Sequence, residues 1–341
     1  MNAEPKKILV ILWGALGDII VATPALRAIR ERYPNAHITY ATNPLMHQIA
    51  PEHVFADKII ALEPEQLKSF LFTIRFGLKL SREKFDFAIN FRYTSERSAL
   101  LTWLSRARVR AGAGPASSMW CYTEKLSYPP SHYHQLYRNT DMVTALGIVP
   151  RNLHPYVFCS AEHRAFAKQW FDANNLSAPV VAMQPGASNA YRAWLPERYA
   201  EIGKRITRDF GIKMIITHAP HERAAAEFVA EQVGDAALLA PATPTVGHLA
   251  ALFEQCSMVI CNNSGAMHVA VAIDTPVVAL HGSTELEDWQ PLGEKHRSVK
   301  SPVTSSEWNP AEERRAMDAL SLDTVWDTVS KRLEELLSAA K

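Results

Sequence analysis

The residues best suited to chemistry in the first half of the chain follow its first apolar run. Lys7 to Trp13 is a run typical of a buried parallel strand, and it ends at Gly14-Ala15-Leu16-Gly17-Asp18. A helical stretch then continues to about Tyr33. A carboxylate placed after the strand and its glycine turn projects away from the sheet, where it can take a proton from a hydroxyl group. Asp18 is therefore a candidate general base, unless its carboxylate only caps the helix.

A second candidate site lies between Cys256 and Thr284. An apolar run, Met258 to Cys261, ends at Asn262-Asn263-Ser264-Gly265, and a helix-compatible segment follows before another β-branched run. A helix that starts at Ser264 and Gly265 points unpaired N–H groups and its positive dipole end into the turn, which suits a phosphate or diphosphate. An ordinary capped helix is the alternative. His268, one turn inside this helix, could face the phosphates or simply pack.

Two further charged side chains follow strand ends in the second half of the chain. Gln184-Pro185-Gly186-Ala187-Ser188 ends a strand, and the guanidinium of Arg192 shortly after it can neutralise a diphosphate through two N–H groups. Arg192 could equally be a surface residue on a flexible loop. Glu222 follows the next strand and could accept hydrogen bonds from ribose hydroxyls, or serve as a carboxylate in the first turn of a helix.

Two other kinds of site are not indicated. The turn after the first strand lacks the Gly-x-Gly-x-x-Gly spacing of a nicotinamide-binding loop, and the next strand ends without an acidic residue for a ribose. The histidines show no zinc-site spacing. Glu285, Glu287 and Asp288 could hold Mg²⁺, but a solvated loop is the better interpretation. We therefore expect no metal and no cofactor, so that Ser264 and Arg192 carry the charge of a leaving group.

Alternating strands and helices must position these groups. Strands are expected in the first half at His37 to Thr42, Lys58 to Leu62, Phe85 to Asn90 and Val109 to Ala113, with a closing helix over His132 to Leu146. In the second half they are expected at Val180 to Gln184, Lys213 to Thr217, near Leu238, at Met258 to Cys261 and at Pro276 to His281. This alternation predicts two doubly wound α/β domains that face each other across a cleft, with ligands at the carboxyl ends of the strands.

The chain length of 341 residues suits two domains. Gly147 to Pro155 has two prolines and no periodicity, and we expect it to be the linker between a first domain over residues 1–150 and a second over 156–318. Loop residues from Glu285 to Arg315 are expected to lead to a C-terminal segment, 319–341. Its amphipathic helix, Leu322 to Leu337, could pack back towards the first domain.

The charge is distributed unevenly between the two halves. Residues 1–150 hold 18 Lys and Arg against 12 Asp and Glu, whereas residues 151–341 hold 18 against 23. An anionic partner is therefore expected to meet the first half. Between Leu67 and Arg82, four cations fall on one helical stripe beside bulky apolar residues, which could rest on an anionic membrane surface: Lys68, Arg75, Lys79 and Arg82. We favour the alternative, a packed helix with one solvated face.

The cysteines and the apolar runs indicate the cellular compartment in which the protein is expected. Four cysteines show neither metal-ligand nor redox spacing, so we expect reduced thiols in a cytosolic protein. The apolar run after Lys6-Lys7 breaks at Gly14 and carries Asp18, which fits neither a signal peptide nor a membrane span. A cytoplasmic protein is expected, at most peripheral at the inner face of the cytoplasmic membrane, with no nucleic-acid partner.

Three motifs occur together in the order typical of one known family. The first is ILWGALGDIIVATPALRAIRERYP, with its Gly-Asp turn and Thr-Pro-Ala-Leu; the second is PGAS followed by Arg192, Trp194 and Pro196; the third is NNSGAMHVAVAIDTPVVALHGST. Over nearly its whole length the chain thus resembles glycosyltransferase family 9, the bacterial heptosyltransferases of lipopolysaccharide core assembly.

This resemblance implies a GT-B architecture, with two Rossmann-like domains across a cleft, and a metal-independent, inverting transfer of heptose. The first domain would bind the acceptor and the second the donor, ADP-heptose. Asp18 matches the general base, and Glu222 resembles the ribose-binding acid. The donor diphosphate would contact Ser188, Arg192, Ser264, Gly265 and His268. The acceptor, an anionic glycolipid such as one carrying Kdo on lipid A, would contact Gly17, Arg92 and Arg97.

The chain departs from the family pattern at two places. Asn263 stands where the family often has Asp before Ser-Gly, and Arg192-Ala193-Trp194-Leu195-Pro196 is one residue longer than the usual Lys-x-Trp-Pro. Backbone N–H groups do most of the phosphate binding, so Asn263 is compatible with it. Other interpretations stay open: a GT-B transferase with another nucleotide sugar or a protein acceptor, a sugar-nucleotide epimerase, and a non-catalytic sugar-nucleotide sensor.

Overall fold

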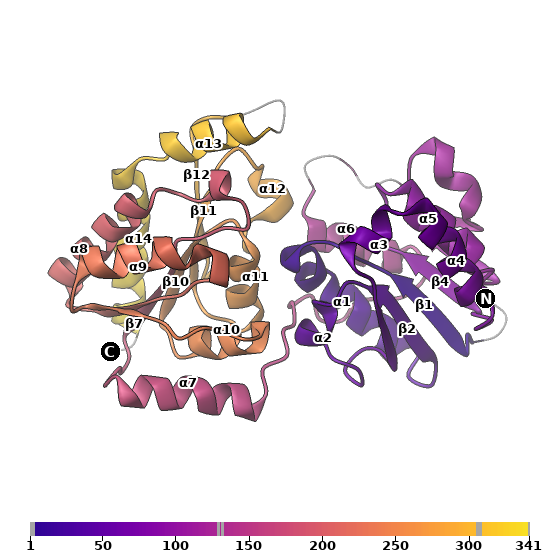
Figure 1. Cartoon of the computed structure of the whole chain (residues 1–341), viewed down its shortest axis with the longest axis horizontal. Coiled ribbons are helices and arrows are strands. Elements are labelled where there is room, and N and C mark those ends of the chain that lie inside the picture. Colours follow the sequence, from indigo (N-terminus) through magenta and orange to yellow (C-terminus); the bar gives the residue numbers. More distant parts are fainter. Residues whose placement is uncertain (1–3, 128–129, 131–132, 305–308, 340–341) are drawn as a thin grey trace. The chain divides into compact units, whose positions relative to one another are not determined.

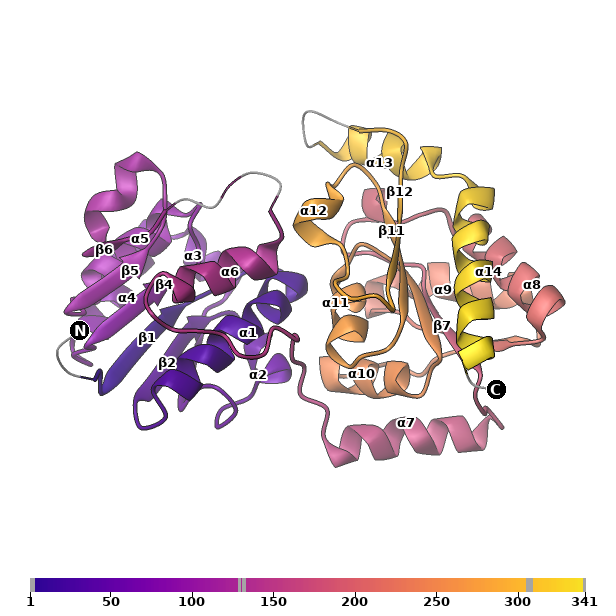
Figure 2. The ribbon, with the colours of Figure 1, turned by 180° about the vertical axis from the view of Figure 1, so that it is seen from behind.

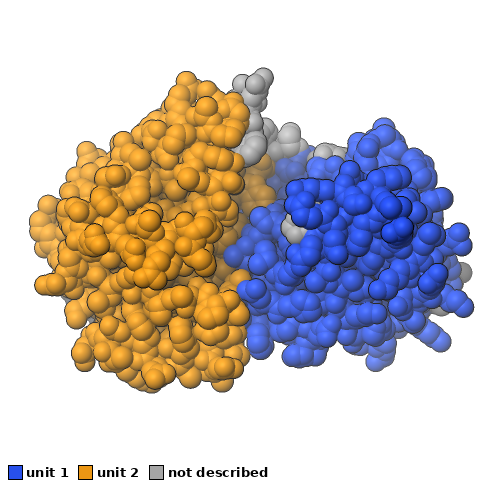
Figure 3. All heavy atoms as spheres, viewed as in Figure 1, with its two compact units in different colours: residues 1–158 blue, residues 159–341 orange. Residues whose placement is uncertain are grey.

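The chain forms two compact units that meet in the sequence at Phe158 and Cys159 (Figures 1 and 3). The computed structural model describes residues 4–127, 130, 133–304 and 309–339. The boundary lies just past the predicted linker, Gly147 to Pro155. Each unit contains its own parallel sheet, so each is a domain in the structural sense.

The first unit is built on a six-stranded sheet, as far as its described residues show, in the order β3-β2-β1-β4-β5-β6. All neighbouring strands are parallel. The strands are β1 (Lys7–Ile11), β2 (His37–Thr42), β3 (Lys58–Ala61), β4 (Phe87–Asn90), β5 (Val109–Gly112) and β6 (Glu124–Lys125). The helices are α1 (Leu16–Arg32), α2 (Met46–Ile49), α3 (Pro64–Lys68), α4 (Phe70–Ser81), α5 (Glu96–Leu104), the 3-10 helix η1 (Ala116–Cys121) and α6 (Gln135–Thr144). The predicted start of the last of these helices, His132, lies outside the described residues.

The second unit repeats this plan in the order β12-β11-β10-β7-β8-β9, again with parallel neighbours. Its strands are β7 (Val180–Gln184), β8 (Lys213–Ile216), β9 (Ala237–Leu239), β10 (Met258–Asn262), β11 (Val277–His281) and β12 (Arg297–Lys300). Its helices are α7 (Ala161–Ala173), η2 (Ala190–Arg192), α8 (Pro196–Phe210), η3 (Pro220–Glu222), α9 (Arg223–Val233), α10 (Val246–Glu254), α11 (Gly265–Ala272), α12 (Leu286–Trp289), α13 (Pro310–Ala319) and α14 (Leu322–Ala339).

Both sheets reverse their strand order once, which fixes where a ligand can bind. The reversal lies between β1 and β4 in the first unit and between β7 and β10 in the second. These central strands are buried on both faces, which explains their continuous apolar sequences. The crevice beyond the carboxyl ends of strands at such a reversal is the usual ligand site of doubly wound domains. The loops after β1, β4, β7 and β10 are therefore the segments to inspect.

The prediction that residues Glu285 to Arg315 form a loop is wrong. It contains α12, the edge strand β12 and the start of α13. The sequence of β12, RSVK, has no apolar run because only Val299 is buried, and the strand is specified by pairing with β11. In α13 the apolar signal is equally sparse, since the helix buries Ala316 and Met317 among charged residues.

The prediction of one continuous basic helix between Leu67 and Arg82 is also wrong. Ser69 ends α3 and begins α4, where its hydroxyl accepts a hydrogen bond of 3.2 Å from the N–H of Phe72. Lys68 therefore belongs to α3, while Arg75 and Lys79 belong to α4. A serine cap inside a segment of helical periodicity is a helix start, and it separates the expected stripe into two parts.

The C-terminal helix belongs to the second unit. Val325, Val329 and Leu333 of α14 are buried in the same apolar core as residues of β7, β8 and β10. The helix contacts β12, β11 and α8, and it lies beside α8 in both ribbon views (Figures 1 and 2). The sequence had left open a return of this helix towards the first domain, but its apolar face completes the core of the second unit.

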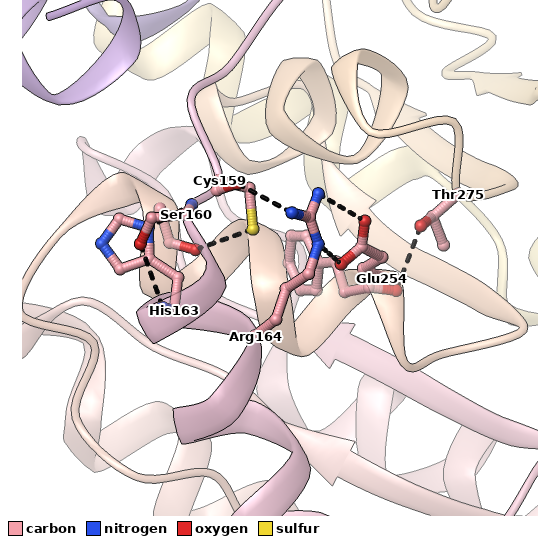
Figure 4. Close-up of polar contacts among 8 residues, drawn as sticks. Cys159, Ser160, His163, Arg164, Glu254 and Thr275 are labelled. Carbon is pink, nitrogen blue, oxygen red and sulfur yellow. Dashed lines mark hydrogen bonds and ion pairs between the residues drawn. The ribbon is translucent and has the colours of Figure 1, made fainter.

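The start of the second unit is fastened to α10 through α7 (Figure 4). Arg164 binds both carboxylate oxygens of Glu254, at 2.7 and 3.1 Å, and also donates to the carbonyl of Cys159 at 3.0 Å. A Cβ on Gly247 would lie 2.2 Å from the ring of His163, so the close approach of the two helices requires glycine there. The unit boundary is thus followed at once by contacts between α7 and α10.

Candidate functional site

Asp18 lies in the first turn of α1, directly after β1. Its Oδ2 accepts a hydrogen bond of 2.8 Å from the N–H of Ala15, the residue that precedes the helix. A Cβ on Gly14 would lie 2.6 Å from the Cβ of Asp18, so the turn closes over this side chain only with glycine. Asp18 therefore has the helix-capping role that the sequence suggests. The capping hydrogen bond uses only one of its two carboxylate oxygens.

The second oxygen of Asp18 faces Arg92. Oδ1 lies 4.0 Å from Nη1 of Arg92, which follows β4 on the other side of the strand reversal. The Arg92 backbone is held by Asn90, whose Oδ1 accepts from the Arg92 N–H at 2.9 Å. Nε of Arg92 is buried and has no hydrogen-bond partner among the described residues. The sheet topology thus joins a carboxylate and a guanidinium that are far apart in the sequence.

Burial raises the pKa of Asp18 above its ordinary value of 3.8, while the Ala15 N–H and the charge of Arg92 oppose that rise. The group has 26% of its side-chain surface exposed, so water and a small hydroxyl group can reach it. A carboxylate with a raised pKa is a stronger base than an ordinary aspartate. The pair can therefore bind an anionic molecule and accept a proton from it.

The other two residues predicted to bind the acceptor, Gly17 and Arg97, differ in where they lie relative to Asp18. Gly17 is buried in the first turn of α1 beside Asp18. Arg97 is exposed on α5, where it lines a pocket with Phe70, Leu100 and Trp120. The contacts described for Asp18 include Arg92 but not Arg97.

In the second unit, Asn262 binds two loops together at the strand reversal. This residue ends β10 and is fully buried. Its Oδ1 accepts from the N–H of Trp194 at 3.0 Å, and its Nδ2 donates to the carbonyls of Pro185 and Gly186 at 2.9 and 3.0 Å. From the sequence alone, Asn262 is only a turn residue. A polar side chain at the last position of a wholly apolar strand was the signal for this role.

The start of α11 has no side-chain cap. Ser264 immediately precedes the helix, is half-buried, and its hydroxyl makes no capping hydrogen bond. Gly265 is the first helical residue. His268 is buried one turn later, with its ring 5.7 Å from the ring of Trp289 in an edge-on arrangement. The helix start therefore presents backbone N–H groups that its own cap residue leaves uncovered, as an anion site requires.

Arg192 is anchored, contrary to the flexible-loop alternative. Its Nη2 donates to Oγ1 of Thr284 at 3.1 Å, and its Nε lies 3.8 Å from Oε1 of Glu313. The guanidinium is 30% exposed, and its Nε makes no hydrogen bond to a described residue. Ser188, in the loop after β7, is exposed.

Glu313 was not anticipated from the sequence. It comes from α13, is 2% exposed, and accepts hydrogen bonds from the N–H and the hydroxyl of Ser283. Gly282 lets the carboxylate approach, because a Cβ there would lie 2.6 Å from Oε1. Lys300 holds the same loop from β12 by donating to the carbonyls of Gly282 and Thr284, both at 2.8 Å. The loop that carries Thr284 is thus fixed on two sides.

Glu222 is positioned by the last residue of β7 and by the loop after β8. Its Oε2 accepts from Nε2 of Gln184 at 2.5 Å and from the N–H of Ala219 at 2.8 Å. A Cβ on Gly186 would lie 2.2 Å from Cδ of Glu222, which explains why this turn contains glycine. Oε1 has one described partner, His221, at 3.7 Å. The carboxylate is thus oriented through one oxygen, and the other can accept from a ligand.

Among the described residues, no three His, Cys, Asp or Glu side chains come together in a group that could hold a metal ion. Glu285, Glu287 and Asp288 stand at α12 without forming such a group. Arg192, Lys300 and the start of α11 place positive charge at the carboxyl edge of the second sheet.

Comparison with known proteins identifies the family. A sequence model described as glycosyltransferase family 9 (heptosyltransferase) matches residues 73–316. The chain belongs to this family. The match contains the second and third motifs with Arg192, Glu222 and Ser264, whereas Asp18 lies before its start. As a member of glycosyltransferase family 9, the protein is a glycosyltransferase.

Individual family members are similar over most of the chain. The lipopolysaccharide core heptosyltransferase OpsX of Haemophilus influenzae is 23% identical over 287 residues, which cover 81% of this chain and 79% of the relative. The crystal structure of a family 9 glycosyl transferase from Veillonella parvula matches with a TM-score of 0.85 at 22% identity, over 98% of this chain and 99% of that one. The ADP-heptose lipopolysaccharide heptosyltransferase II of E. coli matches with a TM-score of 0.74 at 20% identity, over 98% and 100%. The fold is therefore GT-B, with two Rossmann-like domains.

Proposed function

We propose that this family 9 glycosyltransferase moves a heptose from ADP-heptose to an anionic glycolipid acceptor of the lipopolysaccharide inner core, with inversion and without a metal. The proposal is supported by the family match and by relatives described as lipopolysaccharide heptosyltransferases. We place the reaction in the cytoplasm, at the inner face of the cytoplasmic membrane.

The observation that carries the acceptor half is the pairing of Asp18 with Arg92 at the β1/β4 reversal. Arg92 would attract the carboxylate or phosphate of the acceptor, and its buried Nε is available for a hydrogen bond. Oδ1 of Asp18 would then take the proton from the acceptor hydroxyl as that oxygen attacks the anomeric carbon. Inversion requires this attack from the face opposite the nucleotide. Oδ2 stays bonded to Ala15, so the base keeps its orientation throughout.

The donor half would bind through the carboxyl edge of the second sheet. The uncapped N–H groups at Ser264 and Gly265 would bind the diphosphate, and Arg192 would neutralise the charge that develops on it as the bond to the sugar breaks. Ser188, exposed after β7, and His268 would add hydrogen bonds. Oε1 of Glu222 would accept from the ribose hydroxyls, because Oε2 is already engaged by Gln184 and Ala219. Fixed donors of this kind stabilise a leaving group without reorganisation at the moment of reaction.

The nucleotide preference tests the donor assignment. Melting temperatures would be measured with ADP, UDP and GDP, and transfer would be followed by mass spectrometry with ADP-heptose and a deacylated Kdo-lipid A acceptor. The proposal expects stabilisation by ADP above the other two and a product heavier than the acceptor by one heptose. Preference for UDP or GDP would contradict the assigned donor and favour another sugar.

Omitting the acceptor separates transfer from epimerisation. A sugar-nucleotide epimerase converts the donor alone, whereas a transferase leaves the sugar configuration unchanged until an acceptor is added. An epimerised sugar nucleotide formed from ADP-heptose alone would therefore contradict the proposal, and tight binding without any turnover would indicate a sensor. Transfer to a protein in place of the glycolipid would keep the enzyme class and change the acceptor.

A further inference from the structure

The large apolar side chains left in solvent gather on one part of the first unit. Among the described residues, five of the seven large apolar residues classed as exposed belong to α4, α5 or η1. They are Phe70, Leu71, Leu78, Trp103 and Trp120. Helix α5 packs against both α4 and η1, and α4 and α5 lie beside each other in Figure 1. We call this group of residues the α4–α5 surface.

The exposed side of α4 mixes these apolar residues with cations. Leu71, Arg75, Leu78, Lys79 and Arg82 are all exposed, and their spacing places them on one side of the helix and its C-cap. Arg75, Lys79 and Arg82 make no ion pair with a described residue. Residues 68–110 contain ten Lys and Arg against three Asp and Glu, so this segment accounts for the positive charge of the first half.

The two tryptophans extend the surface onto α5 and η1. The rings of Trp103 and Trp120 meet edge to face, with their centroids 5.4 Å apart. Trp120 and Phe70 are 57% and 61% exposed, and both line a pocket of about 380 Å³ together with Leu100. This volume falls within the range of small-molecule pockets. The pocket also contains the polar residues Glu96, Arg97, Ser117 and Ser118, and the rings of Phe70 and Trp120 lie at the surface and not in the core.

We propose that the α4–α5 surface docks the enzyme on a bilayer that contains anionic lipids. Side chains such as Phe, Leu and Trp beside Lys and Arg are the composition of elements that lie in a membrane interface: the apolar groups enter the acyl boundary and the cations meet lipid phosphates. An interface between proteins would share the aromatic residues and Arg, and sedimentation velocity without vesicles, below, separates that case. No helix among the described residues is long and apolar enough to cross a bilayer, so this contact is peripheral.

This inference is compatible with the proposed glycolipid acceptor but does not rest on it. Binding to vesicles needs neither donor nor acceptor, so it is measured on the full chain without substrates. Transfer to a deacylated, soluble acceptor is measured separately. If the wild-type chain transfers heptose but does not bind vesicles, only the docking surface is contradicted. If it binds vesicles but transfers nothing, only the proposed function is contradicted.

The test is sedimentation with vesicles of phosphatidylcholine alone or mixed with phosphatidylglycerol. The wild-type chain is expected to sediment with the mixed vesicles and to dissociate at high salt. Reversing the charges in Arg75→Glu with Lys79→Glu is expected to lower the partition coefficient by more than about tenfold. The matched control reverses two exposed helical lysines of the second unit, Lys204→Glu with Lys331→Glu, and is expected to bind nearly as the wild type does.

A second pair of variants tests the apolar contribution. Leu71→Ser with Leu78→Ser is expected to weaken binding by about tenfold, because two side chains no longer enter the acyl boundary. The control, Val149→Ser with Leu153→Ser, removes two other exposed apolar residues of the first unit and is expected to bind as before. Lipids brominated on their chains should quench Trp fluorescence of the wild type, and less so in Trp103→Phe with Trp120→Phe.

Three results would overturn the inference. The first is equal binding of wild type and both surface variants; the second is an equal loss in the Lys204 and Lys331 control, which would indicate net charge alone. The third comes from sedimentation velocity without vesicles. If the wild type forms dimers that Leu71→Ser with Leu78→Ser dissolves, and no form binds vesicles, the surface is an interface between copies of the chain.

Discussion

Oε1 of Glu313 lies 3.8 Å from Nε of Arg192, and the same carboxylate accepts two hydrogen bonds from Ser283. A residue of α13 thereby positions the cation proposed for the donor diphosphate and the loop that carries Thr284. The negative charge of Glu313 also offsets part of the positive charge of Arg192. Glu313 therefore contributes to anion binding by holding Arg192 in position and not by adding attraction.

Glu313→Ala should lower the free energy of unfolding by about 2 to 3 kcal/mol, because the Ser283 N–H and hydroxyl lose their buried acceptor. Chemical denaturation measures this. Glu312→Ala, next to it on α13 and paired with Arg315 on the surface, is the control and should change stability by less than about 0.5 kcal/mol. Equal effects of the two variants would show that the buried network is not what stabilises this loop.

Arg192→Ala should weaken ADP binding by about 10- to 100-fold, the usual effect of losing a charge-assisted hydrogen bond to phosphate. Isothermal titration calorimetry gives the dissociation constant. Lys204→Ala, an exposed cation on α8, provides the comparison and should leave ADP affinity unchanged. An unaltered affinity in Arg192→Ala would remove this residue from the donor site.

Asp18→Asn should lower kcat by about 10²- to 10⁴-fold, since an amide cannot accept the proton but can still accept the hydrogen bond from Ala15. ADP affinity should be unchanged. Asp86→Asn is a matched control, because the carboxylate of Asp86 also accepts from backbone N–H groups, those of Lys6 and Lys7, before β4 begins. A folded Asp18→Asn enzyme with a near wild-type rate would exclude the residue as the base.

The raised pKa of Asp18 predicts a pH dependence of stability. Burial holds the proton more tightly in the folded state than in the unfolded one, so ionisation destabilises the fold as the pH rises from 3.8 through the raised folded-state pKa. Asp18→Asn lacks this ionisation. The free energy of unfolding of the variant minus that of the wild type should therefore increase over this interval and stay constant above it. Urea titrations at a series of pH values measure it, and a difference that decreases with pH would contradict the sign.

Asn262→Ala should destabilise the second unit by about 3 kcal/mol, because one buried N–H and two buried carbonyls lose a partner. Asn263→Ala, its half-buried neighbour, should cost much less. Thermal or chemical unfolding compares the two. If the adjacent substitution costs as much, the connection that Asn262 makes between Trp194 and Pro185 contributes little.

The parts of the fold that the sequence predicted are those with a local signal. The boundaries of β2 and β7 agree with the prediction because β-branched, aromatic or other apolar residues fill most of each segment. β12 was missed because an edge strand with one buried residue needs β11 to specify it. α13 was missed because its buried residues are few and its buried acid, Glu313, resembles a surface charge until the loop after β11 is in place.

The amino-acid order by itself determined the alternation of strands and helices, the glycine turns after β1 and β7, and the motifs of glycosyltransferase family 9, because these depend on residues close together in the chain. Only the tertiary structure decided which distant side chains meet: Arg92 with Asp18, Glu313 with Arg192, and Asn262 with the loops on either side of it. The reason is physical. A parallel sheet places the carboxyl ends of its strands at one edge, and the order of its strands, which no local pattern encodes, selects the neighbours.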